Sequence, residues 1–526
     1  MKTLLHNSLL EITTSYREKT AVIFDGINYS YDWMNNASNN MAAYLQNSDF
    51  KRGDRGIICL GNSVEAIVSF WAIIKAGGVV SNIGFEITSD NLKYIISDAE
   101  PSIVISRVEK IEGIKELLDT ETCVKNVIVV GDSVEGAKER MYEEVISYNA
   151  NAVIDSGVLD IDLASIIYTS GSTGAPKGVM LTHRNMSAAL SSLNSYLEYS
   201  DRDRVLCALP MSFDYGLYQM IMSFSVGATL VLEKEFTWPI FLVRNLSKYE
   251  ITVFPIVPTL LMLLHEYMGH KNLTSNEVCK VTNTGAAINE NHISMARKIF
   301  PNAEIFSMYG LTECKRCTYL PPADIDRKPG SVGVAIPNTE LWLIDDDNNR
   351  IDKPNVIGQL VIRGSTVMAG YWRKPEQTQA RLKAGIIPGD IVLHTGDYCR
   401  LDEEGYLFYE GRMDHVIKSA GMKVSPLEVD NHLVTIEGIE TAAVIGVEHV
   451  KKGEVLCAFV TLLKGVDLTA EEIINQCANT LEYYKVPQYV IILDTLPKTA
   501  NGKFDLVKLK NTNVFYDDEE EVSLAH

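Results

Sequence analysis

The sequence predicts an α/β fold with a large N-terminal domain of layered α/β subdomains and a β-rich subdomain, followed by a small α+β C-terminal domain. Three observations support this prediction. Short apolar runs alternate with helical patterns in the first half, Gly, Asp and Asn turns separate short strands after residue 340, and a compact mixture of helices and strands follows residue 411. Strands that alternate with helices are typical of layers built on parallel sheet. We place the domains at 1–411 and 412–526.

Length, composition and charge limit the classes of protein to consider. At 526 residues the chain is too long for one hydrophobic core, so we expect at least two domains. A hydrophobic share of 46% and a charged share of 22% are typical of a soluble globular protein. The formal net charge of −20 argues against nucleic-acid binding, which rewards basic surfaces. The sequence has no signal-peptide pattern and no apolar run of 18 residues, so we expect a cytoplasmic protein without membrane insertion.

The cysteines point to a reducing environment. Nine of them are spread over the chain without the spacing of a disulfide framework, which indicates free thiols. Cys314 and Cys317 form one Cys-x-x-Cys pair, but no second ligand pair accompanies it. We therefore expect neither a metal site nor a redox role at this pair.

In the first half, strand-like runs are separated by helical segments. One helix begins after Ser63, is apolar on most faces and ends at a Gly-Gly pair. Glu65 and Lys75 interrupt its apolar block, so it is not a transmembrane span. A second helix is predicted over 183–196. The predicted strands are 56–60, a run that begins at 79, 102–105, 124–130, 163–168, 229–232 and 252–256.

The second half contains short strands and then a mixed unit of helices and strands. The strands before residue 411 lie among Gly, Asp and Asn turns and indicate the β-rich subdomain. Thr469 and Glu472 form a capping box that begins a helix in the C-terminal domain. The tail at 517–526 opens with five acidic residues, and we expect it to be solvated and unstructured. The predicted elements are strands 340–344, 358–362 and 405–409, helix 426–434, strands 442–447 and 455–462, helix 469–481 and strand 489–493.

A loop rich in Ser, Thr and Gly follows the strand that ends at residue 168. Glycine lets backbone N–H groups turn toward one point, hydroxyl groups add donors, and a lysine adds a positive charge, so the loop suits a polyphosphate. It differs from the common P-loop, because Pro176 stands where that motif has its second glycine. The residues expected to bind phosphate are Thr169, Ser170, Gly171, Ser172, Thr173, Gly174 and Lys177.

This loop resembles the phosphate loop of the adenylate-forming superfamily, which includes acyl-CoA synthetases, adenylation domains of non-ribosomal peptide synthesis, and luciferases. Further motifs follow in the order of that family and span nearly the whole chain. The resemblance implies ATP-dependent activation of a carboxylic acid as an acyl-AMP with release of pyrophosphate, and then transfer to a phosphopantetheine thiol. The further motifs are Tyr309-Gly310-Leu311-Thr312-Glu313, Gly396-Asp397, Gly411-Arg412-Met413-Asp414, Lys418-Ser419-Ala420-Gly421 and Asn501-Gly502-Lys503.

The resemblance also implies a role for each motif in binding ATP and Mg²⁺. The Ser/Thr/Gly loop would hold the β- and γ-phosphates, Thr312 would contact the α-phosphate, and Glu313 would help to hold Mg²⁺, which prefers oxygen ligands. Asp397 would accept hydrogen bonds from the ribose hydroxyls, with Arg412 as an added donor. Outside this set of motifs, an aspartate that follows a glycine is more often a structural turn residue. The residues expected around the adenine are Tyr309, Gly310, Gly285, Ala286 and Ala287.

Lys503 is the expected catalytic lysine. A cation between the carboxylate and the α-phosphate lowers their repulsion and stabilises the transition state. Lys498 lies in the same loop, but the position directly after Asn-Gly favours Lys503. In this family the C-terminal domain is mobile, so it would bring Lys503 to the site for adenylation and then rotate to admit the thiol. Asp414 matches the hinge position.

Asp214 is the residue that bears on the choice of acid. It stands where many acyl-CoA synthetases carry a histidine and where amino-acid-activating members carry an aspartate that pairs with the α-ammonium. The alternative roles are a helix cap or a structural ion pair, because a buried carboxylate needs a positive partner. Arg316 would oppose an ammonium, so the amino-acid interpretation requires its side chain to point outward. The other residues expected around the acid are Tyr215, Tyr218, Pro255, Thr282, Thr284, Met308 and Cys317.

Three functions stay open at this point. Two tyrosines and a methionine leave limited room, which favours a compact acid such as L-proline, loaded onto a carrier protein by a stand-alone ligase. The second function is an AMP-forming acyl-CoA synthetase for a fatty or aromatic acid, with CoA as the thiol. The third is a nucleotide-binding protein without catalytic activity. The intact lysines, Glu313 and Asp397 argue against this third function.

Overall fold

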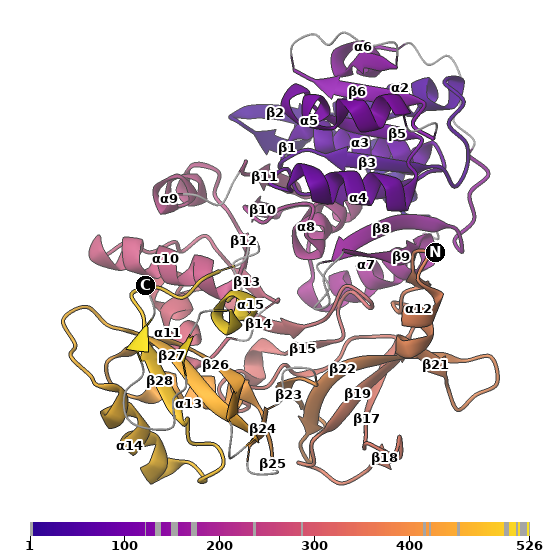
Figure 1. Cartoon of the computed structure of the whole chain (residues 1–526). Coiled ribbons are helices and arrows are strands. Elements are labelled where there is room, and N and C mark those ends of the chain that lie inside the picture. Colours follow the sequence, from indigo (N-terminus) through magenta and orange to yellow (C-terminus); the bar gives the residue numbers. More distant parts are fainter. Residues whose placement is uncertain are drawn as a thin grey trace. The chain divides into compact units, whose positions relative to one another are not determined.

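The structure is a computed structural model of the chain (Figure 1). It describes residues 4–120, 123–131, 138–148, 156–169, 176–234, 238–285, 288–413, 417–419, 422–449, 453–498, 504–511, 514–515 and 523–524. The chain packs into two compact units, one of residues 1–341 and 362–394 and the other of residues 342–361 and 395–526. The expected hinge, Asp414, lies outside the described residues, so the domain boundary near it stays a prediction.

The first sheet is mostly parallel and has the strand order β20-β9-β8-β4-β3-β5-β6-β7. β3 pairs in parallel with β4 and β5, whereas β8 and β9 form an antiparallel pair. Buried aliphatic side chains of α4 and α5 pack against β3 and β5. The strands are β3 Arg55–Cys59, β4 Val79–Ile83, β5 Ile103–Arg107, β6 Asn126–Val130, β7 Glu139–Met141, β8 Leu163–Thr169, β9 Lys177–Thr182 and β20 Gly370–Tyr371. The helices are α2 Tyr31–Asn47, α3 Val64–Lys75, α4 Ser89–Ala99, α5 Val108–Thr120 and α6 Tyr142–Ile146.

The second sheet has the order β16-β15-β14-β13-β12-β10-β11-β1-β2 and is parallel from β14 to β1. Parallel strands buried on both faces read as continuous apolar runs, which explains the apolar pattern at β11 and β12. Its strands are β1 Thr20–Phe24, β2 Ile27–Ser30, β10 Arg204–Cys207, β11 Thr229–Leu232, β12 Val253–Ile256, β13 Lys280–Asn283, β14 Glu304–Tyr309, β15 Thr318–Leu320 and β16 Val334–Ala335. The helices of this part are α1 Asn7–Ser15, α7 His183–Leu197, α8 Asp214–Val226, α9 Pro239–Lys248, α10 Pro258–His270, α11 Glu290–Ile299 and the short 3-10 helix η1 Pro322–Asp324.

A third sheet has the order β18-β17-β19-β22-β21, with β23 paired to β22. The strand predicted from residue 405 begins two residues later, because Gly405 lies in a turn with φ +82° in which the Asp402 side chain accepts from two backbone N–H groups. The elements are β17 Thr339–Ile344, β18 Arg350–Ile351, β19 Gly358–Gly364, α12 Pro375–Arg381, β21 Leu382–Ala384, β22 Ile391–Leu401 and β23 Leu407–Arg412.

The C-terminal part is an α+β arrangement around the sheet β25-β24-β27-β26, with β28 beside β27. The capping box is confirmed, since the Thr469 side chain accepts from Glu472 N–H and the Glu472 side chain accepts from Thr469 N–H. Of the tail at 517–526 the structure describes only β30, which pairs with β29. The elements are β24 Ile417–Ser419, β25 Met422–Val424, α13 Pro426–Thr435, β26 Ile439–His449, β27 Gly453–Leu462, α14 Ala470–Thr480, β28 Tyr489–Ile492, α15 Leu506–Lys510, β29 Val514–Phe515 and β30 Ser523–Leu524.

The predicted α/β class, with a large N-terminal and a small C-terminal part, is confirmed. In the described part of the chain, none of the helices has the length and apolar character that a membrane span requires.

Candidate active site

The Ser/Thr/Gly loop joins two strands of the first sheet. Thr169 ends β8 and Lys177 begins β9, and the two residues are direct partners in the antiparallel register. The loop therefore closes a hairpin, and both of its described ends lie side by side. Ser170, Gly171, Ser172, Thr173 and Gly174 lie outside the described residues, so their contacts with phosphate stay predictions.

The second motif forms the turn between β14 and β15. Tyr309 and Thr318 are register partners, and the Cys317 N–H donates to Tyr309 O at 2.9 Å, which closes the turn of residues 310–317. The turn is tight, because a Cβ atom on Gly310 would lie 2.2 Å from Lys315 O. Lys315 itself has a φ of +67°. This short turn therefore holds neighbouring side chains in different directions.

Glu313 is hydrogen-bonded to β20, which pairs with the strand that follows the Ser/Thr/Gly loop. Its Oε1 accepts from the Tyr371 hydroxyl at 2.8 Å, and its backbone oxygen accepts from the Met368 N–H at 2.7 Å. Tyr371 lies in β20 and pairs with Val179 of β9, two residues after Lys177. The structure thus connects Glu313, through β20 and β9, with the end of the Ser/Thr/Gly loop. Sequence reasoning missed Tyr371, because a Gly-Tyr pair has no spacing relation to the known motifs.

The residues expected around adenine and acid meet at the carboxyl ends of two neighbouring parallel strands. Met308 and Tyr309 end β14, and Thr284 and Gly285 directly follow β13, whose Asn283 pairs with Ser307. Ligands of α/β sheets bind at such strand ends. Gly285 has a φ of +85°, which favours glycine. Ala286 and Ala287 lie outside the described residues.

Asp397 and Arg412 belong to the second unit and pair with each other. They are register partners on β22 and β23, and Arg412 Nε lies 3.3 Å from Asp397 Oδ1. Asp397 is buried, and its N–H donates to Thr395 Oγ1. Both Gly396 and Asp397 lie within strand β22, and Gly396 has a φ of +71°. Their contact with ribose stays a prediction.

Two further predicted residues lie outside the described part of the chain: the hinge Asp414 and the catalytic Lys503. Of the loop that carries Lys503, the structure describes only the two ends. Lys498 and Phe504 form a β-bridge, and Asp505 N–H donates to Pro497 O at 2.9 Å, so the loop is closed at its base.

Asp214 is the first residue of α8 and is only 4% exposed. Both of its oxygens have cationic partners: Lys315 Nζ lies 2.6 Å from Oδ1, and Arg316 Nη1 lies 3.3 Å from Oδ2. The outward orientation expected for Arg316 is therefore wrong, because a buried carboxylate requires positive partners and this arginine is one of them. The sequence analysis did not predict a role for Lys315, because its partner Asp214 is 101 residues away in the chain.

Tyr215 and Tyr218 lie beneath the two cations. The Arg316 guanidinium carbon is 5.1 Å from the centre of the Tyr215 ring, and Lys315 Nζ is 5.6 Å from that of Tyr218. Both hydroxyls have backbone partners, since Tyr215 donates to Thr282 O at 2.6 Å and Tyr218 donates to Met186 O at 3.2 Å. Burial raises the pKa of both phenols, so they are neutral. Arginine and lysine over aromatic faces are stabilised further by cation–π attraction.

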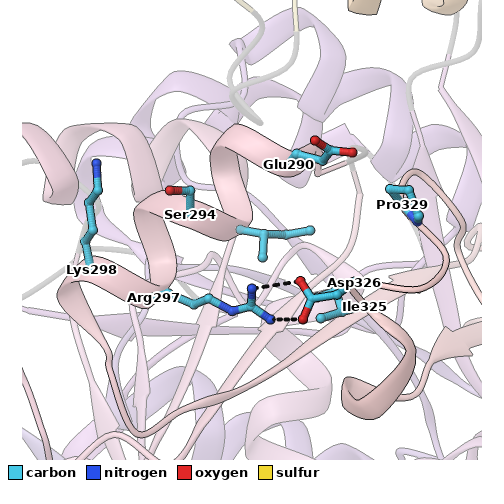
Figure 2. A pocket seen from close by; sticks show the side chains of 8 residues that line it. Glu290, Ser294, Arg297, Lys298, Ile325, Asp326 and Pro329 are labelled. Atoms are coloured by element: carbon cyan, nitrogen blue, oxygen red, sulfur yellow. Dashed lines mark hydrogen bonds and ion pairs between the residues drawn. The ribbon is translucent and has the colours of Figure 1, made fainter.

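Cavities elsewhere do not contain these residues. One of about 480 Å³ lies between α11 and the segment after η1, where Arg297 forms a two-bond ion pair with Asp326 (Figure 2). Its lining is charged and none of it belongs to the predicted motifs. We therefore assign no part of the reaction to this cavity. Its lining residues are Glu290, Ile293, Ser294, Arg297, Lys298, Ile325, Asp326 and Pro329.

Comparison with known proteins decides the family. The family model of AMP-binding enzymes matches residues 11–372, and the model of the AMP-binding enzyme C-terminal domain matches residues 428–503. The chain belongs to the AMP-binding enzyme family. It is therefore an AMP-forming acid–thiol ligase that uses ATP, as the motifs predicted.

Relatives of this AMP-binding enzyme include CoA ligases and much longer synthases. The chain is 30% identical to a long-chain-fatty-acid–CoA ligase of Escherichia coli O157:H7, over 93% of this chain and 91% of the relative. It is 28% identical to bacitracin synthase 3 of Bacillus licheniformis, over 93% of this chain but 7% of that protein. The solved structure of ATP-bound MatB from Rhodopseudomonas palustris is 27% identical, with a TM-score of 0.87 over 97% of this chain and 99% of that chain.

Proposed function

We propose that this enzyme activates a carboxylic acid without an ammonium group and transfers the acyl group to the thiol of CoA. One observation carries the proposal: Lys315 and Arg316 occupy both oxygens of Asp214. An α-ammonium would need one of these oxygens, and it would be a third cation beside a single carboxylate. Like charges that share a buried site disfavour one another. The similarity to fatty-acid–CoA ligases supports the same assignment.

The described residues fit the nucleotide and the metal that adenylation requires. Glu313 is partly exposed, and Tyr371 engages only its Oε1. The described residues hold no group of three or more His, Cys, Asp or Glu side chains suited to a metal. Mg²⁺ in phosphate-transfer sites needs only one or two carboxylates, because phosphates and water complete its shell. Glu313 therefore suits Mg²⁺, which would neutralise phosphate charge when bound.

The remaining roles follow the motifs. The hairpin ends at Thr169 and Lys177 would hold the leaving phosphates, and Thr312 would contact the α-phosphate. Tyr309 would lie against adenine, and Asp397 would accept from the ribose hydroxyls. The acid's carboxylate oxygen attacks the α-phosphorus, pyrophosphate leaves, and the CoA thiol then displaces AMP. Lys503 would stabilise the negative charge of the first step.

A second candidate is the loading of a small amino acid, such as L-proline, onto a carrier protein. The position of Asp214 and the similarity to bacitracin synthase 3 and tyrocidine synthase 1 favour it. It requires that a substrate ammonium replace Lys315 or Arg316 at the Asp214 carboxylate. The two candidates therefore differ in one measurable property, which is the effect of the amine on activity.

The test is ATP–pyrophosphate exchange with pairs of acids that differ only in the amine, such as L-proline and cyclopentanecarboxylate, or L-alanine and propionate, together with dicarboxylic and aromatic acids. We expect exchange with acids that lack the amine and at least tenfold less with their amino counterparts, which corresponds to about 1.4 kcal/mol. Exchange confined to amino acids would overturn the proposal in favour of the second candidate. Adding CoA or a carrier protein to the competent acid then identifies the thiol.

A further inference from the structure

The ion group formed by Asp214, Lys315 and Arg316 carries one more positive charge than negative. The three side chains are 5%, 0% and 6% exposed. Titratable groups that act on these ions, among the described residues, include the Tyr196, Tyr215 and Tyr218 phenols, whose pKa is raised by burial, and the Cys314 thiol. Because burial raises their pKa, the phenols are neutral near pH 7 and add no negative charge. A buried cation without a matching anion is unfavourable, so the group is incomplete as it stands.

Arg316 has an unused donor in the same place. Its Nη1 donates to Asp214 Oδ2 and, at 2.9 Å, to Lys315 O. Its Nε is buried and has no hydrogen-bond partner among the described residues. A buried N–H without an acceptor is unfavourable, and such groups are rare in folded proteins. An oxygen atom beside Nε would satisfy this donor.

Proton loss from Lys315 is the other way to balance the charge. A neutral Lys315 would remove the surplus charge, but it would leave the Arg316 Nε without an acceptor. A carboxylate supplies both the negative charge and the oxygen, and the guanidinium fork matches its geometry. A bound carboxylate therefore accounts for both observations.

The position of the group in the chain limits the length of its ligand. Arg316 follows Glu313 by three residues in the same turn, so their Cα atoms lie within about 11 Å of each other. Under the proposed function, Glu313 marks the end where the acid is joined to AMP. A second carboxylate that reaches Arg316 would thus belong to a short molecule rather than to a long acyl chain.

We propose that the enzyme activates a short dicarboxylic acid and that Arg316, supported by Lys315, binds the carboxylate that does not react. This inference rests on the proposed function and names its substrate class. One carboxylate oxygen forms the bond to the α-phosphorus while the bond from that phosphorus to pyrophosphate breaks. The second carboxylate keeps its negative charge throughout and completes the ion group.

The experiment compares each diacid with its own monomethyl ester, which keeps one carboxylate and loses the other charge. The probes are malonate, succinate and glutarate, each beside its ester, with butyrate and hexanoate as monoacids, all measured by ATP–pyrophosphate exchange. For the preferred diacid we expect kcat/KM to exceed that of its ester by about 100-fold, since a site built for a polar group rejects an analogue that lacks it. In Arg316→Gln this ratio should fall below about 10, with the change mainly in KM, and Arg316→Lys should restore part of it.

Arg297→Gln is the matched control, because this arginine also pairs with an aspartate but lies at the surface (Figure 2). In Arg297→Gln, the ratio of kcat/KM for the diacid to kcat/KM for its ester should equal the ratio in the unaltered enzyme. Equal exchange with diacids and esters, or an Arg316→Gln variant with an unchanged ratio, would overturn this proposal while leaving the proposed function intact. Exchange confined to amino acids would instead overturn the proposed function.

Two other experimental outcomes call for a second measurement. If no acid supports exchange, the proposed function fails, and calorimetric titration of the three diacids into the protein with ATP and Mg²⁺ decides whether the dicarboxylate site exists. If Arg316→Gln does not fold, as judged by its thermal transition, Lys315→Gln and Arg316→Lys provide the comparison. A ratio unaffected in both would contradict the proposal.

Discussion

Glu313 depends on one hydroxyl group for its orientation. Tyr371 donates to Oε1 at 2.8 Å, and the second oxygen, Oε2, is the one left for a cation. A carboxylate held at one oxygen loses less rotational freedom when it binds a metal, because part of that freedom is already lost. Under the proposed function, Tyr371 would act on the metal through Glu313 as a positioning residue.

Tyr371→Phe removes this hydrogen bond and keeps the ring. We expect the Mg²⁺ concentration for half-maximal pyrophosphate exchange to rise about tenfold, which corresponds to ~1.4 kcal/mol and is near the lower end for a hydrogen bond to a charged group. A titration of exchange activity with MgCl₂ measures it. Tyr483→Phe is the control, because that tyrosine is 77% exposed. An unchanged Mg²⁺ dependence in Tyr371→Phe would show that Glu313 does not need the hydroxyl.

The sequence could predict site residues only where a local motif carries them. The run from Tyr309 to Glu313 and the ends of the Ser/Thr/Gly loop were predicted in this way. Tyr371 and Lys315 were not, because their partners are 58 and 101 residues away and only the folded chain brings them together. The orientation of Arg316 was predicted wrongly for the same reason.

The turn between β14 and β15 is the element on which the site depends most. It carries Glu313 toward Tyr371, and two residues later it carries Lys315 toward Asp214. The backbone approach at Gly310 makes this possible, because Lys315 O lies where a side chain would begin. A larger residue at 310 would therefore displace both sets of contacts.

Gly310→Ala should lower kcat/KM for pyrophosphate exchange by about 100-fold, since relief of such an overlap costs roughly 1–3 kcal/mol and shifts Glu313. The effect should appear with every acid tested. Gly269→Ala in α10 is the control, because a Cβ atom there meets no neighbour within 4 Å. Full activity of Gly310→Ala would mean that the turn tolerates a different path.

Elements with a strong periodic pattern were predicted well, and their ends less well. β8, α7, α13 and α14 agree with the predicted segments within a residue or two. A Gly-Asp pair can lie in a turn or, as at 396–397, within a strand, here next to the irregular pairing of β22 with β23. Local composition does not separate these two cases.

At the scale of the whole molecule, three buried bases set the response to pH. His183 is fully buried and accepts from the Leu5 N–H, His6 lies with its ring centre 6.0 Å away, and Lys75 is held by three side-chain oxygens at 2.8 Å. Burial lowers the pKa of both histidines to about 4 and that of Lys75 to about 7. The charge of Lys75 adds to the shift of His6.

These shifts predict a loss of stability in acid. Between pH 6.5 and 4 the unfolded chain binds protons at both histidines whereas the folded chain does not, so the free energy of unfolding falls as the pH falls, by about 3 kcal/mol for each histidine over the whole interval. Lys75 also lowers the free energy of unfolding as the pH falls from its usual pKa of 10.5 to its pKa of about 7 in the folded chain. Below pH 7 it adds no further change. Urea unfolding at pH 7.5, 6.0 and 4.5 measures the effect.

His6→Gln removes one of the titrating groups, so we expect a smaller fall in the urea midpoint between pH 7.5 and 4.5. His270→Gln, at an exposed position, should leave the pH profile unchanged. Equal profiles for His6→Gln and the unaltered protein would contradict the assignment of this acid sensitivity to the buried pair.

The whole-molecule organisation was predictable in outline. Alternating strands and helices gave the α/β class, and the order of motifs over the chain gave the family. The sequence could not give the pairing of β20 with β9, because these strands are about 190 residues apart and β20 has only two residues. That pairing is what connects Glu313 to the loop before β9.

The shared turn has a consequence for how the enzyme's substrate range can change. Under the two proposals, residues that choose the acid and residues that set the reaction rate stand on one backbone segment, so a substitution that alters selectivity would also disturb turnover. Laboratory evolution toward a new acid should therefore pass through slow intermediates and regain speed by second substitutions at positions that support the turn. Covalent geometry would then couple the choice of acid to the rate of the reaction.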